Sequence, residues 1–172
     1  MPQGSMQTLL GTILFTLLVP CTVAGLAPYL LSTAGSQLFR VSLPGQEIAG
    51  GLVAAAGVAI YLWCAWNFTF VGRGTPSPTH PPRALVVRGL YHFSRNPMYV
   101  GVVSVLIGEA LATGSGNQLA YTVACAAGFH IRVVLGEEAT LRRTFGAAYD
   151  EYCARVPRWI GIASSKGSRH ED

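Results

Sequence analysis

Two long apolar stretches without a charged residue constrain this chain more than any other feature of its sequence. They cover residues 8–31 and 49–71, and each is longer than 20 residues. An apolar α-helix of about 20 residues spans the hydrocarbon core of a bilayer, which is about 30 Å thick. Only 12% of the 172 residues are charged, against about 25% in a typical soluble domain. The sequence therefore predicts an integral membrane protein.

Two shorter apolar runs follow, at residues 97–112 and 119–135. The first contains Glu109, and the second contains His130 and Arg132 near its end. Four spans in all predict an all-α fold, an integral membrane helical bundle. For the first run, a cleavable signal peptide is the alternative, but no Lys or Arg precedes it and it is longer than the usual signal core.

The Lys and Arg residues are unevenly distributed between the connecting segments. The segment between the third and fourth runs has no charge, and the one between the first and second has only Arg40. The middle segment and the C-terminal segment hold ten of the twelve: Arg73, Arg83, Arg88, Arg95, Arg142, Arg143, Arg155, Arg158, Lys166 and Arg169. This bias predicts that both termini and the middle segment are cytoplasmic. It also explains the pI of 9.1 without a nucleic-acid partner.

One domain is expected over residues 1–163, with a polar tail at 164–172. Beyond the fourth run, apolar residues recur at i, i+4, i+8 and i+11, which predicts a C-terminal amphipathic cytoplasmic helix: Leu141, Phe145, Tyr149 and Tyr152. Glu138 with Arg142 and Glu151 with Arg155 have the spacing of helical ion pairs. Residues 83–93 are too apolar for a free loop and are expected to pack against another part of the protein.

Small residues recur at helical spacing in the second run, at Gly50, Ala54 and Gly57. Such a stripe lets two membrane helices approach closely, so we expect a packing surface there. None of the four cysteines belongs to a C-x-x-C pair. Neither a metal site nor a disulfide framework is indicated.

The third run begins at Arg95-Asn96-Pro97. Asn is favoured as the N-cap of a helix and Pro at its first position, so a helix start is predicted here. A helix start carries a partial positive charge, to which Arg95 adds a full one, and this suits a carboxylate or phosphate. Alternatively, Arg95 reaches the lipid headgroups and Tyr99 belongs to an interfacial aromatic belt.

Two adjacent carboxylates, Glu137 and Glu138, follow the fourth run at about the depth of Tyr99. They are candidates to hold an ammonium or sulfonium group, or they form a solvated helix face with Glu138 paired to Arg142. Arg132 lies within the last turns of the same run. Ionisable groups at membrane depth indicate function by default, although Arg132 is also close enough to the end to reach the headgroups.

Two motifs resemble those of isoprenylcysteine carboxyl methyltransferases and their bacterial relatives, whose general plan the phospholipid methyltransferases share. The run "RGLYHFSRNPMYVG" is similar to G-x-Y-x-x-x-R-H-P-M/S-Y-x-G, and "GEEATLRRTFGAAYDEYCARVPRWI" is similar to E-E-x-x-L-x-x-x-F-G-x-x-Y-x-x-Y-x-x-x-V-P. One departure is Asn96, where the family often has His. Asn cannot titrate, so a proton-transfer role at this position is not expected.

This resemblance implies an S-adenosylmethionine-dependent methyltransferase with a cofactor-binding part at about 83–160, which acts on a lipophilic or lipid-linked acceptor, most simply a carboxylate. Arg95 and Arg132 are expected to orient a carboxylate. The cofactor contacts it implies are Leu85, Val86, Tyr91, Asn96, Pro97, Met98, Tyr99, Glu137 and Glu138. The alternatives are an NADPH-dependent reductase similar to the steroid and sterol reductases, and a non-enzymatic four-span protein. The sequence leaves the identity of the acceptor and the oligomeric state open.

Overall fold

The computed structural model describes residues 20–33, 35–70, 85 and 87–161, with only the backbone for 68–70. These residues form helices, and no strand occurs among them. In chain order the elements are η1 (Thr22–Leu26), α2 (Ala27–Thr33), α3 (Gln46–Phe70), η2 (Gly89–His92), α4 (Pro97–Thr113), α5 (Gly116–Arg132), η3 (Val133–Glu137), α6 (Glu138–Phe145) and α7 (Ala147–Arg155).

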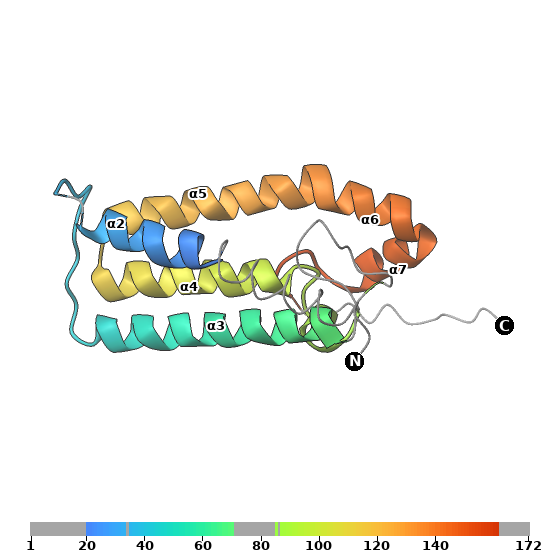
Figure 1. Cartoon of the computed structure of the whole chain (residues 1–172), viewed down its shortest axis with the longest axis horizontal. Helices are drawn as coiled ribbons and strands as arrows, with labels where there is room; N and C mark the ends of the chain where they lie inside the picture. The colour runs from blue at the N-terminus through green and yellow to red at the C-terminus, as the bar shows by residue number, and fades with distance from the viewer. Residues whose placement is uncertain (1–19, 34, 71–84, 86, 162–172) are drawn as a thin grey trace, which may run out of the picture.

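The three long helices α3, α4 and α5 lie side by side (Figure 1). Helix α2 lies at one end of this bundle against α4 and α5, whereas α6 and α7 lie at the opposite end. Helices α4 and α5 are joined by only two residues, because Gly114 adopts a left-handed φ of 60° and Ser115 accepts a hydrogen bond from the Gln118 N–H. An Arg40–Ser115 bridge ties the segment before α3 to this turn.

The predicted membrane spans are confirmed in part. Two helices are long and apolar enough to cross a membrane, Gln46–Asn67 and Gly116–Phe145. Helix α4 is apolar but has only 17 residues. Most of the first predicted span, residues 8–19, lies outside the described residues, as does the tail at 164–172. The chain is therefore an all-helical protein with two candidate spans, and the set of four remains a prediction.

Close packing of α3 on α4 confirms the expected role of the small residues in α3. A Cβ atom added to Gly50 would lie 2.4 Å from the carbonyl oxygen of Gly108, and one added to Gly57 would lie 2.6 Å from that of Gly101. These separations are shorter than any normal contact, so the two backbones touch where the glycines face each other. This contact fixes the position of α4, which carries Tyr99 at its first turn.

The C-terminal part differs from the single amphipathic helix that the sequence predicts. The chain forms α6 and α7 instead, separated by Gly146 with φ 53° and ψ −131°. This conformation is almost exclusive to glycine, and it turns α7 back. Tyr149 and Tyr152 of α7 then form one cluster with Val156, against which Leu85, Val87, Leu141, Phe145 and Cys153 pack. The expected packing of the segment before α4 is thereby confirmed for Leu85 and Val87.

Replacing Gly146 by alanine is expected to lower the free energy of unfolding by about 1–3 kcal/mol, because alanine is strained in this conformation. The added methyl group meets no atom within 4 Å, so backbone strain is the only cost. Gly136→Ala is the matched control, since a Cβ there also meets no atom within 4 Å and its φ is not positive. Urea unfolding of both variants in detergent measures the difference, and equal stabilities would contradict the assigned strain.

Candidate active site

A π-helical turn places the first acidic side chain of the site. Arg132 and Glu137 are five residues apart, and in a regular α-helix they would point about 140° away from each other. Residues Val133–Glu137 form a π-helix, in which hydrogen bonds run from i to i+5. The two side chains therefore share one face, and the Arg132 Nε–H donates to Glu137 Oε1 at 2.8 Å. The sequence does not predict this turn.

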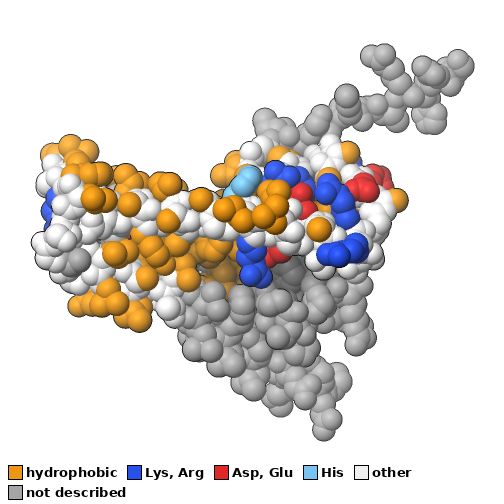
Figure 2. Space-filling view, turned by 90° about the horizontal axis from the view of Figure 1, so that it is seen from above, with side chains coloured by type: hydrophobic (Ala, Val, Ile, Leu, Met, Phe, Trp, Pro, Cys, Tyr) orange, Lys and Arg blue, Asp and Glu red, His pale blue; other side chains and the backbone are white. Residues whose placement is uncertain are grey.

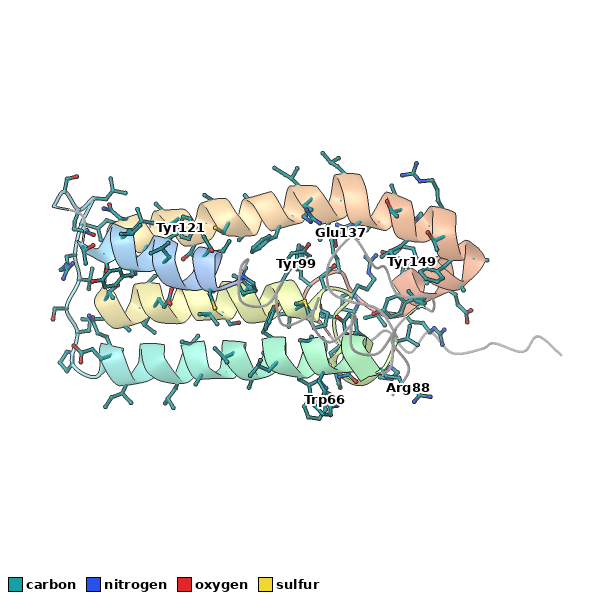
Figure 3. The ribbon with its side chains drawn as sticks, in the orientation of Figure 1. Trp66, Arg88, Tyr99, Tyr121, Glu137 and Tyr149 are labelled. Carbon is teal, nitrogen blue, oxygen red and sulfur yellow. The ribbon has the colours of Figure 1, made fainter. Side chains whose placement is uncertain are left out.

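Tyr99 of α4 completes a group of three side chains that bond to one another. Its hydroxyl donates to Glu137 Oε1 at 2.5 Å and accepts from the Arg132 Nε–H at 3.0 Å. The ring of Phe129 packs on that of Tyr99, with centroids 4.8 Å apart. In Figure 3, Tyr99 and Glu137 lie together between α4 and the long helix above it. The predicted proximity of Tyr99 to the glutamate pair is therefore confirmed.

Glu138 occupies a buried site beside this group, with its side chain only 5% exposed. Arg158 approaches it with two parallel bonds, Nε to Oε1 at 2.6 Å and Nη2 to Oε2 at 3.1 Å. Arg95 Nη1 adds a third bond to Oε1 at 3.1 Å. The predicted pairing of Glu138 with Arg142 is wrong, because Gly146 turns α7 back and Arg142 bonds to Asp150 at 3.0 Å instead. The expected Glu151–Arg155 pair is present at 3.2 Å.

Arg158 is a site residue that the sequence reasoning did not identify. Besides its bonds to Glu138, its backbone carbonyl accepts from Asn96 Nδ2 at 3.0 Å and from Ser94 Oγ at 3.4 Å. It thus joins the start of α4, the start of α6 and the segment after α7. In the sequence, this role is indicated only by the position of Arg158 directly after Pro157, where the C-terminal motif ends.

Asn96 occupies the predicted N-cap position of α4, with Pro97 as the first helical residue. Its side chain forms no capping hydrogen bond. It faces the carbonyl of Arg158 instead. Asn96 therefore holds the segment after α7 against the start of α4, and this bond requires an N–H donor but no change of protonation.

The remaining predicted cofactor contacts that the structure describes pack in two places, against the bundle and against α7. Tyr91 and Cys64 are buried together with Met98 against them, and the Tyr91 carbonyl accepts a hydrogen bond from the Tyr152 hydroxyl at 2.7 Å. Pro97 is buried. Leu85 packs on the tyrosine cluster of α7, and Val86 lies outside the described residues. No observation tests these residues as cofactor contacts, so that role stays a prediction.

The electrostatic balance of the site is positive. Three guanidinium groups surround two carboxylates, which leaves one formal positive charge in excess. Figure 2 shows Arg side chains gathered with acidic ones at this end, whereas hydrophobic side chains are prominent along the rest of the bundle. The hydrogen bond to Glu138 raises the pKa of Arg158. The Nε of Arg95 is buried and has no hydrogen-bond partner among the described residues. The site thus suits an anionic group.

The tyrosines near this cluster are not candidate nucleophiles. Burial raises the pKa of the Tyr149 phenol to about 12, and burial also raises the pKa of Tyr152 and of Tyr91. All three phenols are therefore neutral at physiological pH. The described part of the chain also holds no group of three or more His, Cys, Asp or Glu residues that could bind a metal ion. The arrangement of hydrogen bonds and ion pairs suits binding and positioning.

Comparison with protein families shows to which family the chain belongs. The family model for phospholipid methyltransferase matches residues 46–148, more than half of the chain. The chain belongs to the phospholipid methyltransferase family. This confirms the resemblance to the membrane methyltransferases, and it implies a methyltransferase that acts on a lipid-related substrate. It does not support the reductase alternative.

The match covers most of the site of this methyltransferase. It includes α3, α4, the π-helical turn and both glutamates, and it ends before Arg158. The family membership and the two apolar helices together indicate a membrane-associated enzyme. No curated protein and no solved structure matches the chain.

Proposed function

We propose that this protein transfers a methyl group from S-adenosylmethionine to a lipophilic, membrane-resident acceptor at the site between α4, the π-helical turn and the segment after α7. The proposal rests on two groups of bonded side chains at one end of the bundle: Tyr99, Arg132 and Glu137, and Arg95, Glu138 and Arg158. The chain that carries them belongs to the phospholipid methyltransferase family. The site and both termini are cytoplasmic in this proposal, as the distribution of Lys and Arg predicts.

The residues present fit the cofactor by the chemistry of their groups. S-adenosylmethionine carries a carboxylate, an ammonium and a sulfonium, and it supplies an electrophilic methyl group. Arg132 and the unsatisfied Arg95 Nε are the candidate donors for its carboxylate. Glu137 is a candidate acceptor for its ammonium, because one of its oxygens, Oε2, takes part in none of the bonds to Tyr99 and Arg132. Tyr99 fixes the orientation of that carboxylate.

Methyl transfer needs a nucleophile held in line with the bond between the methyl carbon and the sulfonium sulfur, so positioning supplies most of the catalysis. The site provides rigid support for this role. Glu138 and Arg158 clamp the segment after α7 onto the start of α4, while the glycine contact between α3 and α4 fixes the helix that carries Tyr99. No covalent nucleophile is required, in agreement with the neutral tyrosines.

An acceptor from the membrane is expected to reach the site along α5. The side chain of Arg132 is 55% exposed and that of Glu137 is 33% exposed. The neighbouring Ile131 and Leu135 are exposed apolar residues. A lipid would therefore meet an apolar surface beside a cation. The excess positive charge favours an acceptor with an anionic group, either a carboxylate that is itself methylated or the phosphate next to a phospholipid amine.

Labelled methyl transfer tests this function and distinguishes the two acceptors. The full chain in lipid nanodiscs is incubated with methyl-labelled S-adenosylmethionine and either a prenylated cysteine or a phospholipid amine. A methyl ester releases volatile methanol in alkali, whereas an N-methyl group is retained. We propose a carboxylate as the methyl acceptor because the chain resembles the isoprenylcysteine enzymes, whereas the family match favours the amine of a phospholipid as the acceptor. No labelled product from either acceptor would contradict both forms of the proposal.

Glu137→Gln is the variant that links the activity to this site. Loss of a hydrogen bond to a charged group costs about 1.5–3 kcal/mol, so transfer is expected to fall by about ten- to a hundredfold. Glu151→Gln is the control, because Glu151 is 70% exposed in a surface pair with Arg155. Unchanged transfer by folded Glu137→Gln protein would remove this residue from the site.

A further inference from the structure

The end of the bundle remote from the candidate active site carries a polar cavity of about 470 Å³. It is lined by the end of α2, the segment that leads into α3, the first turn of α3 and the end of α4, with these side chains: Ser32, Arg40, Ser42, Gln46, Glu47 and Thr113. This volume lies in the range of small-molecule sites. Thr113 is 14 residues beyond Tyr99 on α4, so the cavity lies about 20 Å from the candidate active site.

Both signs of charge line this cavity. Arg40 Nη2 donates to the Ser32 carbonyl at 3.3 Å, and this neutral contact leaves its charge without a counter-ion. Glu47 lies in the first turn of α3. Among the described residues, neither Arg40 nor Glu47 forms an ion pair. Both side chains are exposed to solvent, and an open cavity with a cation and an anion at its surface suits a ligand that is itself zwitterionic.

An apolar cavity of about 280 Å³ adjoins the polar one, and Val41 and Gln46 line both. Its other walls are mostly apolar side chains of the same segment and of α4 and α5: Phe39, Leu43, Ile107, Leu111 and Leu119. The segment is held in place by two backbone bonds, from the Val41 N–H to the Gly114 carbonyl at 3.0 Å and from the Gly116 N–H to the Phe39 carbonyl at 2.9 Å.

The residues of this segment alternate in character. Phe39, Val41 and Leu43 line the apolar cavity, whereas Arg40 and Ser42 line the polar one. The apolar residues of the segment are strongly exposed, with Leu43 at 59% and Phe39 at 51%. A ligand with a charged and an apolar part would therefore be accommodated by both cavities together.

We propose that these two cavities bind one zwitterionic phospholipid with a primary ammonium, such as a phosphatidylethanolamine. Arg40 binds its phosphate, Glu47 binds its ammonium, and an acyl chain lies along Phe39, Leu43 and Ile107. Because the headgroup is about 20 Å from Tyr99, this lipid is not the methyl acceptor. It is a bound lipid that holds the segment before α3 on the turn between α4 and α5, and the site is independent of the proposed methyl transfer.

Native mass spectrometry of the full chain from detergent tests this site. Three probes are compared at equal concentration: a phosphatidylethanolamine, a phosphatidylglycerol with the same acyl chains, and glycerophosphoethanolamine, which has none. At the two cavities we expect one phosphatidylethanolamine per chain, bound at least tenfold more tightly than either other probe; a phosphatidylethanolamine bound as acceptor at the candidate active site would persist in the Arg40→Ala variant. Equal binding of phosphatidylglycerol would contradict the role of Glu47, and equal binding of glycerophosphoethanolamine would contradict the role of the apolar cavity.

Two charge variants locate the bound lipid. Arg40→Ala is expected to weaken phosphatidylethanolamine binding about tenfold or more, since a charge-assisted bond is lost. Glu47→Gln is expected to abolish the preference over phosphatidylglycerol. Arg143→Ala on α6 is the control, because Arg143 is exposed and, within the described part of the chain, its side chain bonds only the carbonyl of Ala139. Binding unchanged in both Arg40→Ala and Glu47→Gln would overturn the proposal.

Discussion

Replacing Glu138 by glutamine is expected to lower the free energy of unfolding by about 3–5 kcal/mol, the usual cost of removing one partner of a buried ion pair. The Glu138 side chain is 5% exposed and that of Arg95 is 10% exposed. Glutamine is neutral, so the guanidinium groups of Arg95 and Arg158 would lose their shared counter-ion while Arg95 stays buried. Because these bonds hold the segment after α7, the methyl-transfer activity is expected to disappear as well.

Urea unfolding in detergent measures this effect, with Glu151→Gln as the matched control. The same change at Glu151 breaks an exposed pair with Arg155, and such pairs contribute about 0–1 kcal/mol. Arg158→Lys adds a second comparison, since lysine keeps the charge but cannot form the two parallel bonds. It should therefore lose less stability than Glu138→Gln. A Glu138→Gln protein as stable as the Glu151→Gln control would contradict the assigned role of Glu138.

The second large effect is expected for Gly50→Ala in α3. The added Cβ would lie 2.4 Å from the Gly108 carbonyl oxygen and 2.5 Å from the Ala112 N. Both are backbone atoms of α4, so the helix itself must move. Overpacking of this kind costs about 1–3 kcal/mol or more. The displacement of α4 would also shift Tyr99, so cofactor binding should weaken together with stability.

Gly51→Ala is the control, one residue along the same helix. A Cβ there meets no atom within 4 Å, and alanine favours a helix by about 1 kcal/mol over glycine. It should therefore leave the Tm unchanged or raise it. Thermal unfolding of both variants in one detergent gives the comparison. If Gly50→Ala and Gly51→Ala have the same Tm, the close contact between α3 and α4 is wrong.

Helix positions follow from simple rules that act within a few residues. The uncharged run at 49–71 becomes α3 (Gln46–Phe70), and the run at 97–112 becomes α4 (Pro97–Thr113). The start of α4 at Asn96-Pro97 depends on the fixed φ of proline and its missing N–H, both of which are local properties. The glycine stripe of α3 is also visible in the sequence, and Gly101 and Gly108 of α4 have the same seven-residue spacing, but only the fold shows that the two stripes face each other.

The details of the site depend on geometry that residue spacing does not reveal. A π-helical turn has no clear sequence signature, so the five-residue spacing of Arg132 and Glu137 gives no reason to pair them. The partners of Glu138 come from 43 and 20 residues away, and only the turn at Gly146 brings Arg158 near it. The sequence predicts that Tyr99 and the two glutamates lie at one depth. Only the fold shows that Glu137 is partly exposed whereas Glu138 is buried.

Calorimetric titration of S-adenosylhomocysteine into the full chain in detergent tests the central claim most directly, because it needs no acceptor. The proposed site predicts saturable binding at one site per chain, weakened about tenfold or more in the Glu137→Gln variant and unchanged in the Glu151→Gln control. The absence of binding to the folded wild-type protein, or equal binding by the Glu137→Gln variant, would contradict the assignment of this site.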